Sequence, residues 1–213
     1  MSKLSEWSLT KLDKRFGLEE VATLPSLENL TQFKETLSDE ERGFLSLLQE
    51  SLIVNIDNYN EQELSMHFIG PVFALLKFTN RKYNLFAERQ LSGTIDGEEI
   101  SGLPDGVIAK GFREPEIPYF CLNEYKRESD PNGDPAGQCL VAMLIAQSLN
   151  KPNTPLYGCY VKGRMWFFIS LEGSKYAITE IGYNSCSKEL FTIFSILKNL
   201  KRIIELKFEN ELG

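Results

Sequence analysis

Apolar residues in the first quarter of the chain recur at the spacing of helices. Ser38 followed three residues later by Glu41 is the signature of a capping box, and the apolar residues within 44–48 continue it as a helical stripe. Gly17 and Pro25 punctuate the earlier stretches, since glycine commonly ends helices and proline commonly begins them. The pattern therefore predicts two or three helices in the N-terminal segment.

A further helical pattern begins at Asn60. Asn60 can cap a helix, and Glu61 and Glu63 fall in the first turn, where the helix dipole favours negative charge. Apolar residues follow at helical spacing as far as Leu76. Pro71 lies inside this run, and a kink is expected there because proline lacks the amide donor that a helix needs.

From Tyr83 the apolar period shortens to near two residues, which is typical of strands. Asp96-Gly97 predicts a two-residue hairpin turn that sets Ile95 opposite Glu98. The remaining expected elements are strands at 102–109, 119–126, 156–161, 165–171 and 175–181, a loop at 111–118, a helix at 138–149 started by Asp134-Pro135, and a closing helix at 188–207.

Helices and strands that alternate along the chain indicate the α/β class, with a mixed sheet flanked by helices. The central elements follow the order αβββαβ. We expect two parts: residues 1–55 as a helical N-terminal cap, and residues 56–213 as the core with its closing C-terminal helix.

Composition narrows the classes of function. The 213 residues are 42% apolar and 25% charged, which is ordinary for a globular protein. The net charge of −7 means that any nucleic-acid contact needs a local basic strip. Apolar runs shorter than the roughly 18 residues of a membrane span, and an N-terminus unlike an export signal, predict a cytoplasmic protein without a membrane partner. Four separated cysteines and a single histidine, His67, disfavour zinc sites and histidine triads.

The candidate site residues are Asp105, Glu124 and Lys126. Side chains alternate along a strand, so Glu124 and Lys126 share one face. Two charges at the end of an apolar strand are costly to cover unless they are solvated, paired or given a metal. Taken singly, a solvated Glu–Lys pair and a plain turn at Pro104-Asp105-Gly106 are the simpler interpretations.

The hairpin register adds weight to a site. Counting outward from the Asp96-Gly97 turn sets Glu88 opposite Asp105, and directly opposed carboxylates repel each other. A sheet that accepts such a pair usually neutralises it with a cation, here Arg89 or Lys126, or with a divalent metal. A register slip of one residue would turn Glu88 to the other face.

This pattern resembles the PD-(D/E)XK nuclease superfamily. Pro104-Asp105 on one strand and Glu124-Tyr125-Lys126 on the next match its signature inside an αβββαβ core. Longer stretches are similar to a widespread, poorly characterised bacterial branch of that superfamily, and the likeness covers nearly the whole chain. These stretches are 68–71, 102–106, 119–126, 133–135 and 157–161.

The resemblance implies a restriction-endonuclease-like core and metal-dependent phosphodiester hydrolysis. Superfamily members bind one or two divalent metals through the motif aspartate and glutamate, which implies Asp105 and Glu124 as ligands of Mg²⁺ or Mn²⁺. A carboxylate from the first core helix often joins them, with Glu63 as the first choice and Glu61 as the second. Both are equally well explained as favourable first-turn charges. In the superfamily the motif lysine acts near the attacking water, and the resemblance implies this role for Lys126.

Other residues are expected to support this site. Lys126 beside carboxylates should stay protonated, which suits stabilisation of negative charge better than work as a general base. Glu88 is a supporting carboxylate. Gln138 matches a position where superfamily members often carry a glutamine near the site, and a solvated helix-end amide is the alternative.

The resemblance implies nucleic acid as the substrate, with DNA as the first choice, although the sequence does not distinguish DNA from RNA or endonuclease from exonuclease action. The alternative function is a catalytically silent relative that binds nucleic acid or a protein partner. A homodimer contact is the alternative to sheet packing for the apolar stripe of the closing helix. Scattered cations are more often ordinary solubilising surface charge, and the candidates for phosphate binding are Lys77, Arg81, Lys82, Arg89, Lys110, Arg113, Arg127, Lys151, Lys162 and Arg164.

Overall fold

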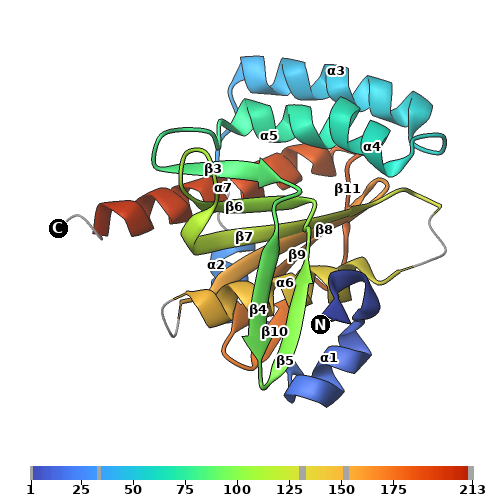
Figure 1. The fold of residues 1–213 in the computed structure, drawn as a ribbon. Coiled ribbons are helices and arrows are strands. Elements are labelled where there is room, and N and C mark those ends of the chain that lie inside the picture. Colours follow the sequence, from blue (N-terminus) through green and yellow to red (C-terminus); the bar gives the residue numbers. More distant parts are fainter. Residues whose placement is uncertain (1, 33–34, 130–132, 151–153, 211–213) are drawn as a thin grey trace.

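A mixed β-sheet with helices on both faces forms the body of the protein (Figure 1). The computed structural model describes residues 2–32, 35–129, 133–150 and 154–210, so Lys151 lies outside the described residues. The helices are α1 (Leu9–Phe16), α2 (Pro25–Gln32), α3 (Asp39–Asn55), α4 (Glu61–Leu64), α5 (Gly70–Leu76), α6 (Pro135–Leu149) and α7 (Glu189–Asn210). The predicted α/β class with a helix-flanked mixed sheet is confirmed. None of the helices within the described ranges is long and apolar enough to cross a bilayer.

Eight strands make the main sheet and three make a smaller one. The strands are β1 (Ser2–Lys3), β2 (Glu19–Glu20), β3 (Tyr83–Ala87), β4 (Leu91–Ile95), β5 (Glu98–Gly102), β6 (Gly106–Lys110), β7 (Glu116–Lys126), β8 (Leu156–Lys162), β9 (Met165–Glu172), β10 (Lys175–Ile178) and β11 (Tyr183–Asn184). The main sheet has the order β2-β10-β9-β8-β7-β6-β3, with β11 paired to β9, and the smaller sheet has the order β1-β5-β4. Because β7 and β8 are parallel neighbours, α6 crosses over between them.

One long hairpin joins the two sheets. Its turn is Asp96-Gly97, both with positive φ, and Ile95 pairs with Glu98 as the sequence predicts. The same register continues into the main sheet, where Ala87 pairs with Gly106. The ladder is interrupted around Pro104, so the expected single strand over 102–109 is two strands with a bend between them. The β4–β5 arm projects from this bend and packs beside α6, with Gly93 against Ile145.

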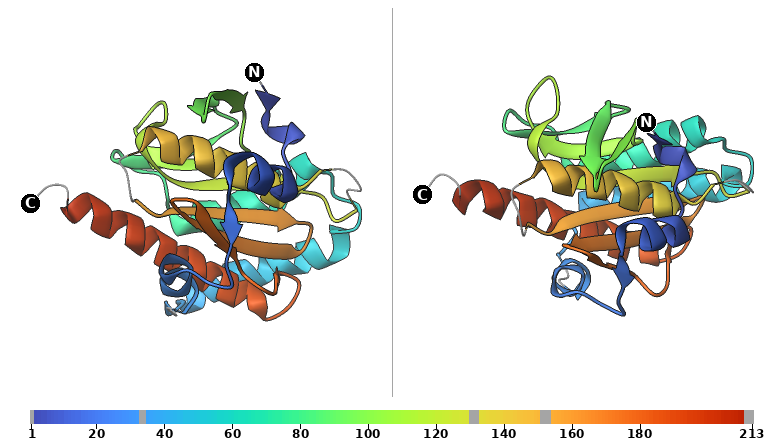
Figure 2. Two further views of the ribbon diagram at one scale, coloured as in Figure 1. Left: turned by 90° about the horizontal axis from the view of Figure 1, so that it is seen from below. Right: turned by 60° about the horizontal axis from the view of Figure 1, so that its bottom comes forward.

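Helices cover both faces of the sheet (Figure 2), and each face carries an apolar core. One core is built by α2, α3, α5 and α7, with Trp166 and Phe194 among its fully buried side chains. The other is built by α1, α6 and the β4–β5 arm, with Leu12 and Ile145 fully buried. α6 and α7 therefore cover opposite faces.

The N-terminal segment contains the predicted helices and two short strands that the pattern does not reveal. α1 ends at Gly17 in the left-handed conformation, α2 begins at Pro25, and Ser38 and Glu41 form both hydrogen bonds of the capping box before α3. β1 pairs with β5, and β2 pairs with β10. Residues 2–32 and 35–55 therefore extend both sheets as well as covering them.

The helical stretch from Asn60 to Leu76 changes its winding before Pro71. Asn60 caps α4, as predicted. One wide π-helical segment, η2 (Ser65–Ile69), separates α4 from α5, and the Gly70 amide donates to the Ser65 carbonyl. Since Pro71 has no amide to donate, the wider turn accommodates the break that the sequence leads us to expect.

The predicted loop over 111–118 is too long. β7 begins at Glu116, three residues before the expected start, and Lys110 pairs with Glu116 across a register shift. The two prolines suggested a loop, but Pro118 lies near the irregular start of β7, where the ladder with β6 is already interrupted.

Asp134 links two helices and is expected to contribute strongly to stability. Its Oδ1 accepts the Gly137 amide at the start of α6, and its Oδ2 accepts the Leu9 amide at the start of α1, at 3.0 and 2.9 Å. Asp134→Ala should lower the free energy of unfolding in urea by about 1–2 kcal/mol, because two helix-start amides lose their acceptor. Asp134→Asn, which keeps one acceptor oxygen, should lose less. Asp39→Ala, which removes an exposed first-turn carboxylate of α3, is the control, and an equal loss in both alanine variants would contradict this role.

Candidate functional site

The bend of the long hairpin brings Asp105 beside the C-terminal end of β7. Gly106 pairs with Asn123, so the antiparallel register sets Asp105 opposite Glu124 one step beyond the last pair. Asp105 Oδ2 accepts the backbone amide of Tyr125 at 2.5 Å. Two carboxylates from adjacent strands therefore lie side by side at one end of the sheet.

Lys126 is the cation of this cluster. Its Nζ lies 3.1 Å from Glu124 Oε1 and 3.4 Å from Glu61 Oε1. The side chain of Glu124 is only 7% exposed and that of Lys126 is 15% exposed. The expected shared face of Glu124 and Lys126 is confirmed, and the alternative of a solvated pair at a frayed strand end is wrong.

The structure brings Glu61 to the site in place of Glu63. Glu63 Oε2 accepts the Asn60 amide at 2.9 Å, and Asn60 Oδ1 accepts the Glu63 amide, so Glu63 serves the capping box of α4. Glu61 also lies in the first turn of α4, and its carboxylate reaches Lys126. Of the two helix carboxylates considered, the second choice, Glu61, is therefore the one that reaches the cluster.

Glu88 lies opposite Asp105, as the register count predicts. The Glu88 amide donates to the Asp105 carbonyl at 3.4 Å, and the Glu88 charge acts on the Asp105 carboxyl. Arg89 does not neutralise this pair, because it faces Glu114 with Nε 3.6 Å from Oε2. Of the two cations considered, Lys126 is the one that serves the carboxylates.

Gln138 lies in the first part of α6 and is 7% exposed, so the alternative of a solvated amide is wrong. A Cβ on Gly133 would lie 3.1 Å from Gln138 Nε2 and 3.9 Å from Lys126 Cε. Gln138 and Lys126 thus approach the same glycine from two sides, which places Gln138 beside the cluster.

Arg164 clamps the surroundings of the site, a role that sequence analysis missed. Its Nε lies 3.0 Å from Glu128 Oε1, just after β7, and its Nη2 lies 2.8 Å from Asp57 Oδ1, just before α4. The Arg164 amide also donates to Glu128. The clamp holds together the two segments that carry Lys126 and Glu61. No local pattern reveals it, since its partners are 36 and 107 residues away.

Burial and mutual repulsion shift the acidity of the two strand carboxyls. Burial raises the pKa of Asp105 to about 6, although the Tyr125 amide and Lys126 oppose the rise. Burial, and then the charge of Asp105, raise the pKa of Glu124 to about 8 against the effect of Lys126. Burial alone would lower the pKa of Lys126, but Glu124, Glu61 and Asp105 outweigh burial and raise it. Lys126 therefore stays charged.

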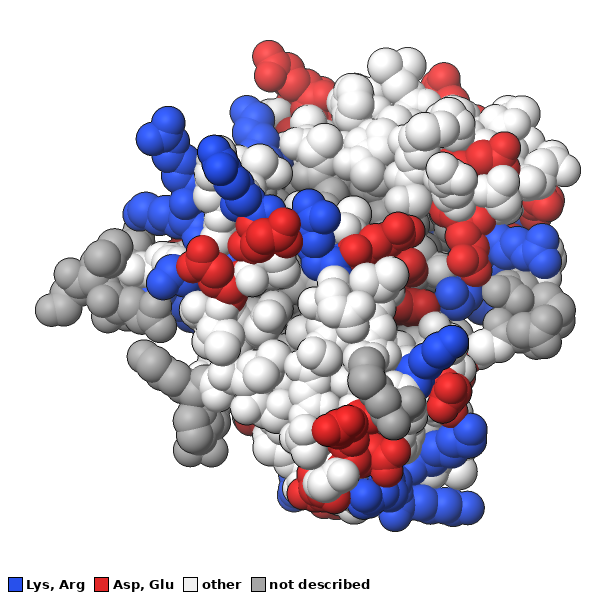
Figure 3. Space-filling model, in the orientation of Figure 1, with Lys and Arg blue, Asp and Glu red and all other residues white. Residues whose placement is uncertain are grey.

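The cluster holds more carboxylate than its single ammonium can neutralise. Figure 3 shows acidic side chains at this end of the sheet with Lys and Arg beside them, and a larger gathering of Lys and Arg, with some acidic side chains among them, at the opposite end. Within the described part of the chain, no three His, Cys, Asp or Glu side chains are grouped so that they could hold a metal ion. The arrangement can hold a proton, stabilise an anion through Lys126, or offer carboxylate oxygens to an added cation.

Comparison with known proteins assigns no family. No family model matches the chain, and a search of curated proteins finds no match. The site therefore has to be interpreted from its own geometry.

The raised pKa values predict that stability falls as pH rises. The carboxyls of Asp105 and Glu124 start from ordinary values of 3.8 and 4.5 and are raised in the folded protein to about 6 and about 8. The folded state therefore binds more protons than the unfolded state between about pH 4 and pH 8, and the free energy of unfolding should decrease across that window.

Glu124→Gln should remove most of this pH dependence. At pH 8 the free energy of unfolding in urea should be higher for the variant than for wild type by at least about 1 kcal/mol, because one pKa unit corresponds to about 1.4 kcal/mol. At pH 4 the two proteins should agree closely. Glu99→Gln, which removes an exposed carboxylate on β5, is the control. If the free energy of unfolding of wild type stays constant between pH 4 and 8, burial of the charged carboxylates does not destabilise the fold and the prediction is wrong.

Proposed function

We propose that the protein is a metal-dependent phosphodiester hydrolase that cuts nucleic acid, with Asp105, Glu124 and Lys126 as its active-site residues. The observation that carries the proposal is the convergence of these three side chains at the ends of two adjacent strands. Asp105 bonds the amide that follows Glu124, and Lys126 lies 3.1 Å from Glu124. The resemblance to the PD-(D/E)XK superfamily names the same three residues.

The order of elements around the site supports the proposal of a restriction-endonuclease-like core. The helical stretch α4–α5 leads into the antiparallel strands β3, β6 and β7, and α6 then crosses over to β8, which is parallel to β7. This is an αβββαβ arrangement, with the β4–β5 arm inserted between its first two strands. The site lies where β6 begins and β7 ends, so the same topology that defines the core brings the motif residues together.

The donor set fits a divalent metal of the Mg²⁺ or Mn²⁺ type. Asp105 and Glu124 offer carboxylate oxygens, which hard cations prefer, and Glu61 takes the place expected for Glu63. Asp105 and Glu124, whose pKa values are raised, share the charge of Lys126 with Glu61, so a bound cation would add positive charge to a cluster with an excess of carboxylates. When bound, such a metal would polarise the phosphate and lower the pKa of a bound water.

The protein's own residues have separate roles in this proposal. Asp105 and Glu124 would hold the cation, and Glu124 would bind it in its deprotonated form. Lys126 stays protonated and stabilises the negative charge that develops on the phosphate. Glu88 adds negative charge behind Asp105, and Gln138 offers an amide beside Lys126. The Arg164 clamp keeps the Glu61 and Lys126 segments in place.

One observation favours the second candidate, a catalytically silent module that binds nucleic acid or a protein. The Lys126 ammonium already satisfies both Glu124 and Glu61, and among the described residues no group of three acids stands ready for a metal. A metal would therefore have to compete with Lys126 for two carboxylates. The cleavage experiment separates an active site from one that is closed by its own lysine.

Cleavage should depend on metal and on all three motif residues. Wild type with Mn²⁺ or Mg²⁺ should cut labelled single- and double-stranded DNA or RNA, and EDTA should stop it. Asp105→Asn and Glu124→Gln, which keep the side-chain shape, should lose activity because they lose a charged ligand. Lys126→Ala should slow cleavage by about 10²-fold or more, because it removes a charge that acts in the transition state. A wild type that shows no metal binding by calorimetry and no cleavage would contradict the hydrolase and favour the silent module.

The two first-turn glutamates of α4 form a matched pair for testing the helix carboxylate. Glu61→Gln should weaken metal affinity and cleavage by about tenfold or more, as expected on loss of a supporting carboxylate. Glu63→Gln should leave both unchanged, since Glu63 caps its own helix and glutamine still accepts the Asn60 amide. Calorimetry and initial cleavage rates provide the measurement. Equal effects of the two substitutions would exclude Glu61 from the site.

A further inference from the structure

A basic groove lies at the end of the sheet opposite the candidate site. It has a volume of about 500 Å³ and lies where β3 begins and β6 ends. Arg81, Lys82, Lys110 and Phe112 line it, together with Glu116 and Phe208. Figure 3 shows Lys and Arg side chains gathered over this end of the molecule. This set of residues is called the basic groove below.

The cations of the basic groove are available to a ligand. Arg81, Lys82 and Lys110 are exposed, and so is Arg113 on the adjoining loop. None of the four has an ion-pair partner among the described residues. The acidic side chain that lines the groove is Glu116, so positive charge prevails there.

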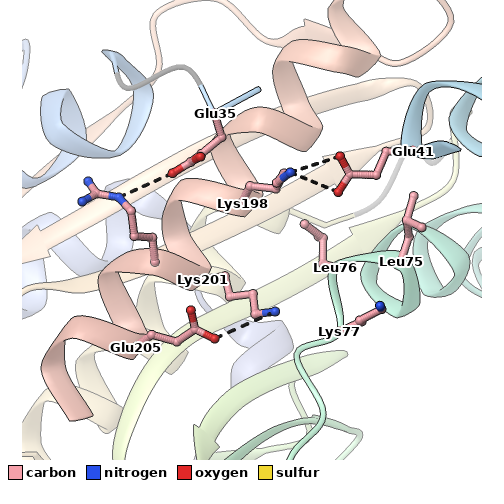
Figure 4. Close-up of a pocket in the computed structure, with 9 residues that line it drawn as sticks. Glu35, Glu41, Leu75, Leu76, Lys77, Lys198, Lys201 and Glu205 are labelled. Carbon is pink, nitrogen blue, oxygen red and sulfur yellow. Dashed lines mark hydrogen bonds and ion pairs between the residues drawn. The ribbon is translucent and has the colours of Figure 1, made fainter. Parts of the chain in front are cut away.

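In a neighbouring hollow between α3, α5 and α7, by contrast, the Lys and Arg side chains of α7 form ion pairs with glutamates of the protein itself (Figure 4). Lys198 Nζ lies 3.0 Å from Glu41 Oε1, Arg202 Nε lies 3.6 Å from Glu35 Oε1, and Lys201 Nζ lies 3.9 Å from Glu205 Oε1. These pairs tie α7 to the N-terminal segment and to its own next turn. As far as the structure describes the chain, the cations of the basic groove form no such pairs, and this contrast favours an external anion.

The two loops that carry the groove cations are held in place by hydrogen bonds. Buried Asn84 donates through Nδ2 to the carbonyls of Asn80 and Gly111, at 2.9 and 2.6 Å. Asn80 Oδ1 accepts the Lys82 amide at 2.7 Å. Gly111 has a φ of 118°, and a Cβ there would collide with the Glu114 carbonyl oxygen. The groove is therefore pre-formed, which lowers the entropic cost of binding a ligand.

Phe112 gives the basic groove an aromatic surface. Its side chain is 60% exposed beside the cations, at a cost that packing in the protein interior would have avoided. Cations along a groove together with an accessible aromatic ring are the combination that binds single-stranded nucleic acid, since the cations contact phosphates and the ring stacks on a base. A duplex keeps its bases stacked internally and would leave the ring unused.

We infer that the basic groove is a single-stranded nucleic-acid anchor, separate from the cutting site and at the other end of β6. The choice of nucleic acid over other polyanions rests on the proposed function, whereas the groove and its charges do not. Asp105 and Lys110 are five residues apart along an extended segment, which at about 3.3 Å per residue separates site and anchor by about 17 Å. A strand that engages both must span that distance.

Binding measured without metal tests the anchor apart from cleavage. Fluorescence anisotropy in EDTA follows a labelled 12-nucleotide single strand across a range of salt concentrations. Arg81→Ala/Lys82→Ala should weaken binding and reduce the slope of log K against log salt by about 1.4, since each phosphate contact on a single strand contributes about 0.7. Lys14→Ala/Lys188→Ala, which removes the same charge from exposed positions on α1 and just before α7, should leave the slope unchanged.

Phe112 provides the second arm of the experiment. Phe112→Leu should weaken single-strand binding by about tenfold, because leucine cannot stack on a base, and Phe112→Tyr should retain it. Equal weakening by the control pair, or equal affinity for duplex or for polyglutamate, would overturn the anchor. If the protein binds through the groove but cuts nothing, the anchor is supported and the proposed function is wrong. If wild type cuts but the Arg81→Ala/Lys82→Ala variant binds as tightly as wild type, the anchor is wrong and the proposed function stands.

Discussion

The charge balance among Asp105, Glu124 and Lys126 is the constraint on which the site depends. Two carboxyls are held at the covered end of the sheet, where transfer from water disfavours their charged forms, and a single ammonium stands against them. Stability alone would be served better by apolar residues at these positions. The cost is understandable if the cluster meets a cation or an anion during function.

The backbone enforces this arrangement. The ladder of the long hairpin is interrupted near Pro104, so that the β4–β5 arm leaves the main sheet and Asp105 falls at the bend. The arm does not swing free, because it packs beside α6 and pairs with β1. On the other side, the Arg164 clamp holds the end of β7 to the segment before α4. Both sides of the site thus rest on contacts between distant parts of the chain.

Local chemistry made much of the fold predictable. Caps at Ser38, Asn60 and Asp134 start their helices as expected, because a side-chain acceptor and an unsatisfied amide lie within three residues of each other. The register set by the Asp96-Gly97 turn continues along the hairpin and places Glu88 opposite Asp105, as predicted. The two-residue strands β1 and β2 were missed, since they exist only through pairing with distant strands and have no periodicity of their own.

The limits of prediction at the site have the same physical origin. Strand alternation suffices to place Glu124 and Lys126 on one face, because that rule is local. The capping rule is local as well and could have separated Glu61 from Glu63, because Glu63 lies three residues after Asn60, as Glu41 does after Ser38, and the box uses its carboxylate. The spacing of Arg164, Glu128 and Asp57 in the sequence does not predict their contact, since ion pairs between distant segments produce no periodic pattern.

The strands β6 and β7 also constrain the relation between the site and the basic groove. Asp105 directly precedes β6 and Lys110 is its last residue, so their separation is set by a hydrogen-bonded ladder and changes little with loop motion. The Asn84 bonds extend this rigidity to the loops that carry the groove cations. Negative charge gathers at one end of these strands and positive charge at the other, so a polyanion is attracted to the groove and repelled by the metal-free site. A cation bound by Asp105 and Glu124 would relieve that repulsion, so the proposed engagement of both ends by one strand would depend on the metal.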